Sequence, residues 1–368
     1  MSTLNLDHQR KQARALLNAV RGGDLDALRR MADAGVAVPT EIALHHAQLV
    51  VARESGFRSW SRLRERVRSE CVGRPRMLAG LLGAANSAAE TARADALFRD
   101  PLACELAGEA GRAVWAATRQ TTWPGYQTSG PDPVISIFTR FFDDGVRRAV
   151  ADAAIAQVVI VGAAMDTRAF RLHWPAGLRL FEVDAGEVFE HKEPVLRRLE
   201  ARPSCQRQTV VVTRDGSFAR QLQRKGFDPA QKAAFLVQGT QFLSEAAAER
   251  TIREVSTLAS AGSWLGLALV SRATLASVFM KIFLDKLESL GLPPWTFGVD
   301  DPDAWLDAQG WTTHTAVAGD PTVSYGRWPY GYIPKGTPGV PRTFLTQAWK
   351  RDITALPGAA CGTAPAPR

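Results

Sequence analysis

A short apolar run that ends on a single glycine constrains this chain more than any other feature. Four β-branched residues, 158–161, precede Gly162 in the stretch QVVIVGAAMDTRAF, which spans residues 157–170. A run of this kind is typical of a buried strand, and a glycine directly after it indicates either a ligand close to the backbone or a tight turn. The stretch therefore predicts a strand, a turn and a helix, and it leaves open whether a cofactor occupies the turn.

A second apolar run supplies a carboxylate at a matching position. LRLFEVD ends on Asp184, about 20 residues after Gly162, which is the separation expected for an acid that binds ribose hydroxyls. A carboxylate suits this task because its two oxygens can accept hydrogen bonds from both hydroxyls. The loop G-A-A-M-D-T lacks the second and third glycines of dinucleotide sites, and Asp166 within it would repel a pyrophosphate. A cofactor with one nucleoside and an ammonium group, such as S-adenosylmethionine, fits better.

Apolar runs alternate with helical stretches over most of the chain. The strand candidates are residues 157–161, 179–183, 209–213, 234–237, 264–270, 312–318 and 343–349. Helices are expected over residues 77–117, 135–153, 186–201, 217–226, 244–260 and 302–309. This alternation predicts an α/β fold with a mostly parallel sheet that is covered on both faces. No helix separates the last two strands, so we expect them to pair antiparallel at one edge.

The N-terminal part, residues 1–70, has a helical pattern of its own. Gly22 and Gly23 separate two helices, and Asp24 can cap the second one. GDLDALRRMADAGV resembles the helix pair of an ankyrin repeat, and a single repeat cannot bury its own apolar face. We therefore expect either an appendage that docks on the main domain or a module that binds a partner. The stretch CVGRPR, residues 71–76, is expected to be a linker.

Composition limits the classes of protein to which the chain can belong. It has 368 residues, of which 46% are hydrophobic, and a net charge of +8, so it can bury a large core. The charge comes without a dense run of Lys and Arg, which argues against nucleic-acid binding. The four cysteines are far apart and form no CxxC pair, so we expect no metal site and a reducing compartment. The sequence has neither a signal-peptide pattern nor an apolar run long enough to cross a membrane. We therefore expect a cytoplasmic protein, with a disordered tail over residues 355–368.

Several segments, in one order along the chain, resemble a single enzyme family. VVIVGAAMDTRAFRLHWPAG resembles the glycine-loop segment of class I S-adenosylmethionine-dependent methyltransferases of the leucine carboxyl methyltransferase type, which include bacterial natural-product O-methyltransferases. Further similar segments are ALFRDPLACELAG, ISIFTRFFDDGVRRAV, LFEVDAGEVFEHKEPVL and GRWPYGYIPKGTPGVPRTFLTQA. The resemblance covers residues 77–350. It implies a Rossmann-like sheet with an antiparallel edge strand, and S-adenosylmethionine as the cofactor.

The resemblance also implies roles for single residues. Arg140 would bind the carboxylate of the methionine part, for which a guanidinium is well shaped. The alternative for Arg140 is a salt bridge with one of the two aspartates that follow it in FTRFFDD. Gly162 and Ala163 would lie against the methionine part and the ribose. Asp166 would accept from the cofactor's amino group or would only cap the following helix. Asp184 would hold the ribose hydroxyls.

The chain departs from the family pattern at three places. The second glycine of the family's loop is replaced by Ala164, whose methyl group narrows the approach to the cofactor. The family's Asp-Leu pair after the third strand aligns with a pair that begins at Val212, so we expect Asp215 to take over the contact near the adenine. The family's Glu-Gly pair after the fourth strand begins here with Gln238, which keeps hydrogen-bonding reach and loses the charge. These changes bear on the strength of cofactor binding, not on the fold.

The acceptor pocket is expected in stretches that vary within the family. These stretches are residues 122–133, 271–300 and 319–342. They are rich in aromatic residues, which suit a bulky apolar or aromatic substrate, and ordinary core packing is the alternative. The candidates for contact with the substrate are Trp123, Tyr126, Trp328 and Tyr330.

The histidines bear on the chemistry of the acceptor. None of His173, His191 and His314 lies beside an acid in a recognisable motif, and a carboxylate acceptor needs no base because it is already ionised. We therefore predict an O-methyltransferase that acts on a small-molecule carboxylic acid or phenol in bacterial secondary metabolism. Two alternatives stay open: a methyltransferase fold without methylating activity, and an interaction protein that uses its N-terminal helices. The oligomeric state is also open, with a homodimer as one arrangement.

Overall fold

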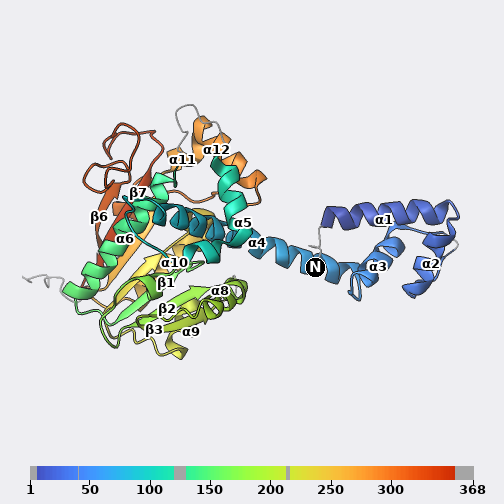
Figure 1. Cartoon of the computed structure of the whole chain (residues 1–368), viewed down its shortest axis with the longest axis horizontal. Helices are drawn as coiled ribbons and strands as arrows, with labels where there is room; N and C mark the ends of the chain where they lie inside the picture. Colours follow the sequence, from blue (N-terminus) through green and yellow to red (C-terminus); the bar gives the residue numbers. More distant parts are fainter. Residues whose placement is uncertain (1–5, 40, 120–129, 213–215, 353–368) are drawn as a thin grey trace, which may run out of the picture. The chain divides into compact units, whose positions relative to one another are not determined.

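The chain is divided into two compact units, and the boundary between them falls inside a helix. The computed structural model describes residues 6–39, 41–119, 130–212 and 216–352. The units are Met1–Pro75 and Arg76–Arg368, and the chain passes from one to the other within α4 (Trp60–Thr91) (Figure 1). The resemblance found in the sequence therefore falls on the second unit.

The N-terminal unit is a small group of helices with a core of its own. Its helices before α4 are α1 (Leu6–Arg21), α2 (Leu25–Asp33) and α3 (Leu44–Glu54). Leu16, Met31 and Val50, one from each helix, are almost fully buried in one cluster. Oδ1 of Asp24 accepts a hydrogen bond from the N–H of Ala27 at 2.9 Å, so the predicted cap of α2 is confirmed. The apolar face of α2 finds its partners in α1 and α3, within the same unit.

The predicted linker, residues 71–76, lies inside the helix α4. The backbone of α4 is helical through this stretch, with Pro75 inside the helix. A proline inside a helix removes one backbone hydrogen bond, but the residues on both sides are rich in Ala, Leu, Arg and Glu, which favour the helix. The stretch still contains the boundary between the two units, which lies at Pro75.

Two further helices precede the sheet. The predicted helix over 77–117 is interrupted, because α4 ends at Thr91 and α5 (Ala103–Arg119) begins after a turn that contains Pro101. Oδ1 of Asp132 accepts a hydrogen bond from the N–H of Val134 at 2.8 Å. This cap starts α6 (Pro133–Asp152), which confirms the predicted helix over 135–153.

The sheet has seven strands in the order β3-β2-β1-β4-β5-β7-β6. Their bounds are β1 (Gln157–Val161), β2 (Arg179–Asp184), β3 (Gln206–Val211), β4 (Ala233–Val237), β5 (Trp264–Val270), β6 (Trp311–Val317) and β7 (Thr343–Lys350). The first five strands are parallel, and β7 lies antiparallel between β5 and β6. Each predicted strand is present, and the last two pair antiparallel at one edge as expected.

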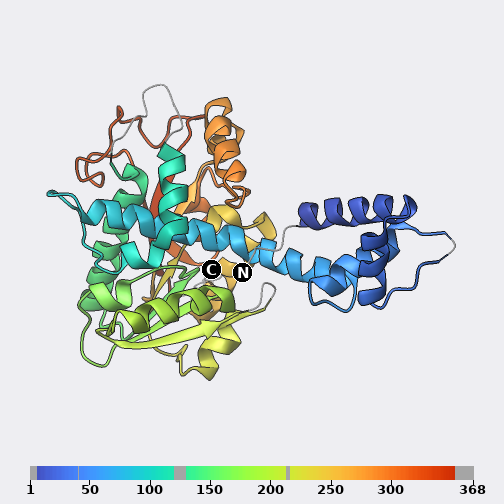
Figure 2. The same cartoon turned by 45° about the vertical axis from the view of Figure 1, so that its right-hand side comes forward.

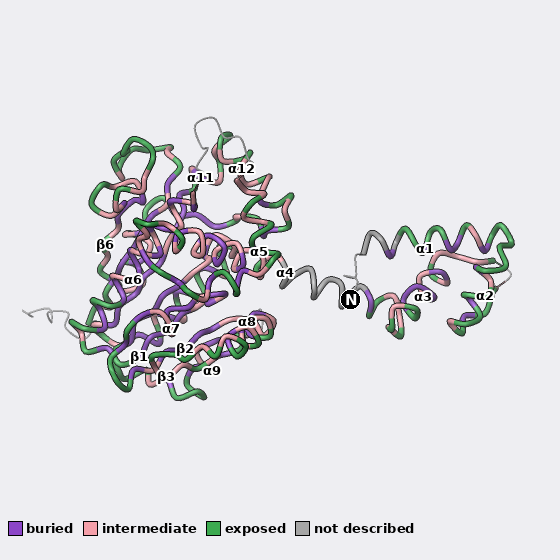
Figure 3. The backbone as a smooth tube through the Cα atoms, in the orientation of Figure 1, coloured by how far each residue is buried: buried purple, intermediate pink, exposed green. Residues whose placement is uncertain are grey.

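Helices cover both faces of the sheet (Figure 2). The remaining helices are α7 (Arg168–Arg171), α8 (Gly186–Arg198), α9 (Phe218–Arg224), η1 (Thr240–Phe242), α10 (Glu245–Leu258), α11 (Arg272–Ala276), α12 (Val278–Ser289) and α13 (Pro302–Asp307). Val159 on one face of β1 packs in a cluster with α9, α10 and α13, whereas Val158 and Ile160 on the other face pack with α6 and α7. A strand that is buried on both sides must be apolar along its whole length. This explains the unbroken run at 158–161 and the buried sheet (Figure 3).

The order of the strands reverses direction next to β1. The chain moves from β1 outwards through β2 to β3 and then returns to the other side of β1 with β4. In open α/β sheets, ligands bind beyond the carboxyl ends of the strands at such a reversal. Gly162 follows β1 and Gln238 follows β4, so both lie at this point of the sheet.

Candidate functional site

The loop after β1 crosses the loop after β4 at van der Waals distance. Gly162 has φ of +72°, and a Cβ atom at this position would lie 2.7 Å from the carbonyl oxygen of Gln238. The N–H of Gln238 donates to the carbonyl oxygen of Val161 at 2.9 Å. Only glycine combines this φ with so close an approach. The glycine is therefore required by the crossing itself, whether or not a ligand lies beside it.

Asp184 is fastened to the same loop. Its Oδ2 accepts a hydrogen bond from the N–H of Ala164 at 2.7 Å, and its Oδ1 accepts one from the N–H of Ala185 at 2.8 Å. Burial raises the pKa of Asp184 above its ordinary value, although the two backbone donors and the Lys192 ammonium act in the opposite direction. A carboxylate has about four acceptor positions, so this one retains positions for the hydroxyls of a ribose.

The amides of Gly162 and Ala163 point back into the sheet. Both donate to the carbonyl oxygen of Val183, at 3.0 and 3.2 Å. Their N–H groups are thus committed to β2. Ala163 is also only 1% exposed, so contact of Gly162 and Ala163 with a cofactor stays a prediction.

Asp166 is buried among positively charged and donor groups. Its Oδ1 accepts from the N–H of Arg168 at 2.8 Å, and its Oδ2 accepts from Nε2 of Gln238 at 3.0 Å. Burial alone would raise the pKa of Asp166, but the charges of Arg168, Lys192 and Arg171 hold it below the ordinary value. Asp166 lies one residue before Thr167, the N-cap of α7, and accepts from the first N–H of that helix. A contact with a cofactor's amino group stays a prediction.

Gln238 uses its amide in the contact with Asp166. An amide can donate to the Asp166 carboxylate, whereas a glutamate at position 238 would place two carboxylates together, and like charges at this distance repel. Gln238 therefore links the loops after β1 and β4 through side chains as well as through backbone.

Arg140 adopts the salt bridge that was the alternative to a cofactor contact. Its Nε donates to Oδ2 of Asp144 at 2.7 Å, and its Nη1 donates to the carbonyl oxygen of Leu97 at 2.8 Å. Its guanidinium lies 5.6 Å from the centre of the Tyr325 ring. The Arg140 side chain is 38% exposed, so binding of a carboxylate by this guanidinium stays a prediction.

A buried ionic network lies under the loop, and the sequence did not single it out. Nε of Arg168 donates to Oδ1 of Asp143 at 2.8 Å, and Nη1 and Nη2 of Arg171 donate to the same carboxylate at 2.5 and 2.9 Å. Oγ1 of Thr167 donates to Oδ2 of Asp100 at 2.6 Å. These residues belong to the segments DTRAFR, FFDD and RDP that carry the family resemblance. The charged residues of these three segments therefore contact one another, and these contacts hold the loop after β1 in place.

Some predicted residues fall outside the part of the chain that the structure describes. These are Asp215, Trp123 and Tyr126. Val212, the first residue of the departing pair, donates its N–H to the carbonyl oxygen of Asp184 at 3.0 Å. The end of β3 is thereby tied to the end of β2.

Trp328 and Tyr330 form an aromatic pair. Their ring centres are 5.3 Å apart in an edge-to-face arrangement. Nε1 of Trp328 is buried and has no hydrogen-bond partner among the described residues. Burial and the nearby charge of Asp132 raise the pKa of Tyr330 to about 12. Nε1 of Trp328 lies against Gly319 and not at the surface, so contact of the pair with a substrate stays a prediction.

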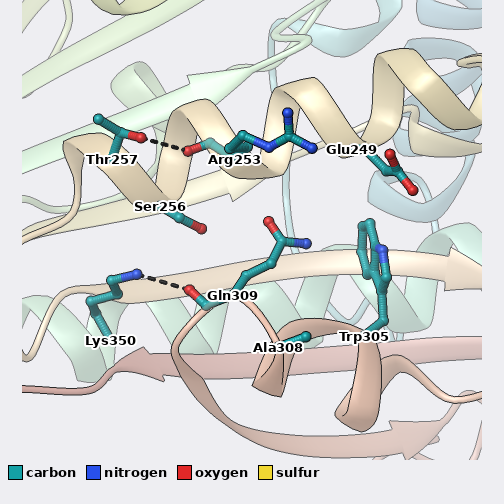
Figure 4. A pocket seen from close by; sticks show the side chains of 8 residues that line it. All are labelled: Glu249, Arg253, Ser256, Thr257, Trp305, Ala308, Gln309 and Lys350. Carbon is teal, nitrogen blue, oxygen red and sulfur yellow. Dashed lines mark hydrogen bonds between the residues drawn. The ribbon is translucent and has the colours of Figure 1, made fainter. Parts of the chain in front are cut away.

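A separate pocket lies near the amino ends of two strands, β5 and β6. It has a volume of about 550 Å³ and lies between α10, α13 and the end of β7 (Figure 4). Nζ of Lys350 donates to the carbonyl oxygen of Gln309 at 2.9 Å beside it. Lys350 lies next to the amino ends of β5 and β6, whereas Gly162 follows the carboxyl end of β1. The pocket is therefore not part of the candidate site.

Within the described ranges, no group of three or more His, Cys, Asp or Glu residues is arranged to hold a metal ion. No helix in the same part of the chain is long and apolar enough to cross a membrane.

Comparison with known proteins places the second unit in a family. A sequence model described as leucine carboxyl methyltransferase matches residues 80–256. A Frankia alni protein named as an S-adenosyl-L-methionine-dependent methyltransferase is 36% identical over 244 residues, which cover 65% of this chain and 84% of that protein. A similarly named Streptomyces coelicolor protein is 33% identical over 265 residues, 68% of this chain and 88% of that protein. A solved DUF574 family protein from Streptomyces avermitilis covers 73% of this chain and 96% of its own, at 14% identity and a TM-score of 0.48. On the sequence matches, the chain belongs to the S-adenosyl-L-methionine-dependent methyltransferases, and its residues 80–256 match the leucine carboxyl methyltransferase model.

Proposed function

We propose that this protein methylates an oxygen atom of a small-molecule carboxylic acid or phenol in bacterial secondary metabolism. The observation that carries the cofactor part of the proposal is the position of Asp184. Its carboxylate stands at the carboxyl end of β2, beside the strand reversal, and is held there by the Ala164 amide. When bound, S-adenosyl-L-methionine supplies a methyl group activated by its positively charged sulfur.

The residues of the chain would bind and orient the two reactants. Asp184 would accept hydrogen bonds from the ribose hydroxyls, and the backbone at Gly162 and Ala163 would allow the methionine part to come close. Arg140 would hold the methionine carboxylate by exchanging its contact with Asp144. Methyl transfer to oxygen is an in-line displacement, so alignment of the two reactants accounts for most of what the protein must do.

The histidines favour an acceptor that needs no base. His173 and His314 are exposed, and a ring nitrogen of His191 lies 3.1 Å from the carbonyl oxygen of Leu106. An ionised carboxylic acid can attack the methyl group without giving up a proton, whereas a phenol benefits from a base. We therefore expect carboxylic acids to be better acceptors than phenols, with Trp328 and Tyr330 against the apolar part of the substrate.

Calorimetric titration with S-adenosylhomocysteine tests the cofactor site. We expect the wild-type protein to bind, and Asp184→Asn to bind about tenfold more weakly or worse, because a hydrogen bond to a charged group is lost. Asparagine keeps one acceptor oxygen for the Ala164 amide, so we expect the loop to keep its conformation in this variant. The control is Asp152→Ala, which removes an exposed acid at the end of α6. Equal binding by wild type and Asp184→Asn would contradict the role given to Asp184.

The acceptor class is tested with a panel of aromatic carboxylic acids and phenols. Products that gain one methyl group are collected by mass spectrometry and treated with dilute base. Methyl esters are cleaved by base and aryl methyl ethers survive, so the treatment separates the two acceptor types. Methylation confined to nitrogen or sulfur compounds in a wider panel would contradict the proposal while leaving the cofactor site intact.

A further inference from the structure

The loop after β1 meets a helix as well as two strands, and the contact is very close. A Cβ atom built on Gly80 of α4 would lie 2.9 Å from the Cβ of Ala164. The same atom would lie 3.8 Å from the Cα of Ala164 and 3.8 Å from the backbone nitrogen of Met165. Two methyl groups cannot occupy this space together. The missing side chain at Gly80 is therefore what allows the helix to lie against the loop.

Ala164 has a backbone conformation that alanine adopts reluctantly. Its φ is +40°, in the left-handed region that favours glycine. Strain of this kind persists only where the surroundings hold the residue in place. Two contacts do so here: the N–H donates to Oδ2 of Asp184 at 2.7 Å, and the methyl group packs against Gly80.

We infer that Gly80 is a positioning residue for the cofactor loop. The space above Gly80 receives the methyl group of Ala164, and this keeps the 164 amide directed at the carboxylate of Asp184. The inference rests on the proposed function, because it takes Asp184 as the group that binds the ribose. Where the family has a glycine in the loop, this chain has an alanine in the loop and places a glycine on the helix opposite it.

A second glycine of the same helix provides a matched comparison. Gly83 is also half-buried on α4, but a Cβ atom built on it would meet nothing within 4 Å. Alanine favours a helix more than glycine does, so both substitutions to alanine carry the same local benefit. Only at position 80 is this benefit opposed by a steric clash.

The test combines Gly80→Ala, Gly83→Ala and Ala164→Gly with the double variant Gly80→Ala/Ala164→Gly. Calorimetric titration with S-adenosylhomocysteine and thermal unfolding are measured for each. We expect Gly80→Ala to bind about tenfold more weakly than the wild type, as contacts of this kind commonly couple. We expect Gly83→Ala to bind as the wild type does and to melt at a higher temperature. The double variant should regain most of the lost affinity, because removal of the methyl group at 164 frees the space again.

The double variant also distinguishes positioning from a general loss of stability. If Gly80→Ala binds as tightly as the wild type, or if Ala164→Gly fails to restore its binding, the inference is overturned. If the wild type itself does not bind S-adenosylhomocysteine, the proposed function fails. The pairing of 80 with 164 is then still judged by melting temperature. Gly80→Ala should melt below the wild type and the double variant should recover, and additive changes would overturn the pairing.

Discussion

Two neighbouring aspartates on α6 show how differently the same side chain can be used. Asp143 is 3% exposed and receives hydrogen bonds from Arg168 and Arg171. Asp144 is 18% exposed and pairs with Arg140 and with an arginine that is half exposed, Arg147. Successive residues on a helix point about 100° apart, so Asp143 points into the core and Asp144 points towards the partly exposed side chains of Arg140 and Arg147. Asp143 holds the loop through Arg168 and Arg171, whereas the more exposed Asp144 would release Arg140 to a ligand under the proposed function.

The largest effect is expected when the buried acid is removed. Asp143→Ala leaves the guanidinium groups of Arg168 and Arg171 without their shared carboxylate in a dry environment. Breaking a buried ion pair by removing one partner costs about 3–5 kcal/mol of folding free energy. Asp144→Ala, as the matched control, should cost about 1 kcal/mol or less because its partners are solvated. Urea unfolding monitored by circular dichroism measures both, and equal losses would remove the distinction between the two acids.

A smaller effect, on ligand binding and not on stability, is expected when Arg140 is replaced. Arg140→Met should weaken S-adenosylhomocysteine binding by about tenfold or more, because a hydrogen bond to a charged group contributes about 1.5–3 kcal/mol. Methylthioadenosine has the same nucleoside but no carboxylate, so its binding should not change. If both nucleosides lose affinity equally, Arg140 serves only the salt bridge to Asp144.

The smallest effect is expected at the crossing of the two loops and depends on pH. Gln238→Glu places a second carboxylate beside Asp166, and repulsion raises the pKa of the new side chain in the folded state. A shift of one unit costs about 1.4 kcal/mol when the group is ionised. A carboxyl with a raised folded pKa carries this penalty above that pKa and loses it once the pH falls below its unfolded value of about 4.3.

Melting curves between neutral pH and about pH 4 test the Gln238→Glu variant against the wild type. The pH range ends at about 4 for a reason that concerns Asp166. Its pKa is lowered in the folded protein, so ionised Asp166 stabilises the fold, and this stabilisation is lost only below the unfolded pKa of an aspartate, about 3.9. The difference in melting temperature should shrink as the pH falls. A constant difference would show that the variant acts through packing, not through charge.

The sheet could be predicted from the sequence because each strand carries its own signal. A strand buried on both faces is apolar along its whole length, so the run at 158–161 directly predicts the central strand β1. The antiparallel edge followed from the missing helix between the last two strands. The linker expected at 71–76 contains the boundary between the two units and is helical, because glycine and proline weaken a helix only locally and strong helix formers lie on both sides.

The site could be predicted only in part, because its charges are paired across long distances in the chain. Asp184 and Gly162 were found from the strand that precedes each of them. The pairing of Asp143 with Arg168 and Arg171 was missed, since charged residues are almost never fully buried unless they find a partner. The role inferred for Gly80 could not be predicted either. From the sequence alone, a glycine inside a helix only lowers its stability, and the contact with Ala164 is seen only in the structure.

The position of β7 between β5 and β6 has a consequence for how the molecule forms on the ribosome. Both antiparallel ladders depend on residues 343–350, which are synthesised after the other six strands of the sheet. Until they emerge, β5 presents an open edge with apolar residues on both faces, and β6 has no neighbour. Such edges invite pairing with other chains. Synthesis that stalls before this strand would therefore yield an aggregating product, not a smaller enzyme.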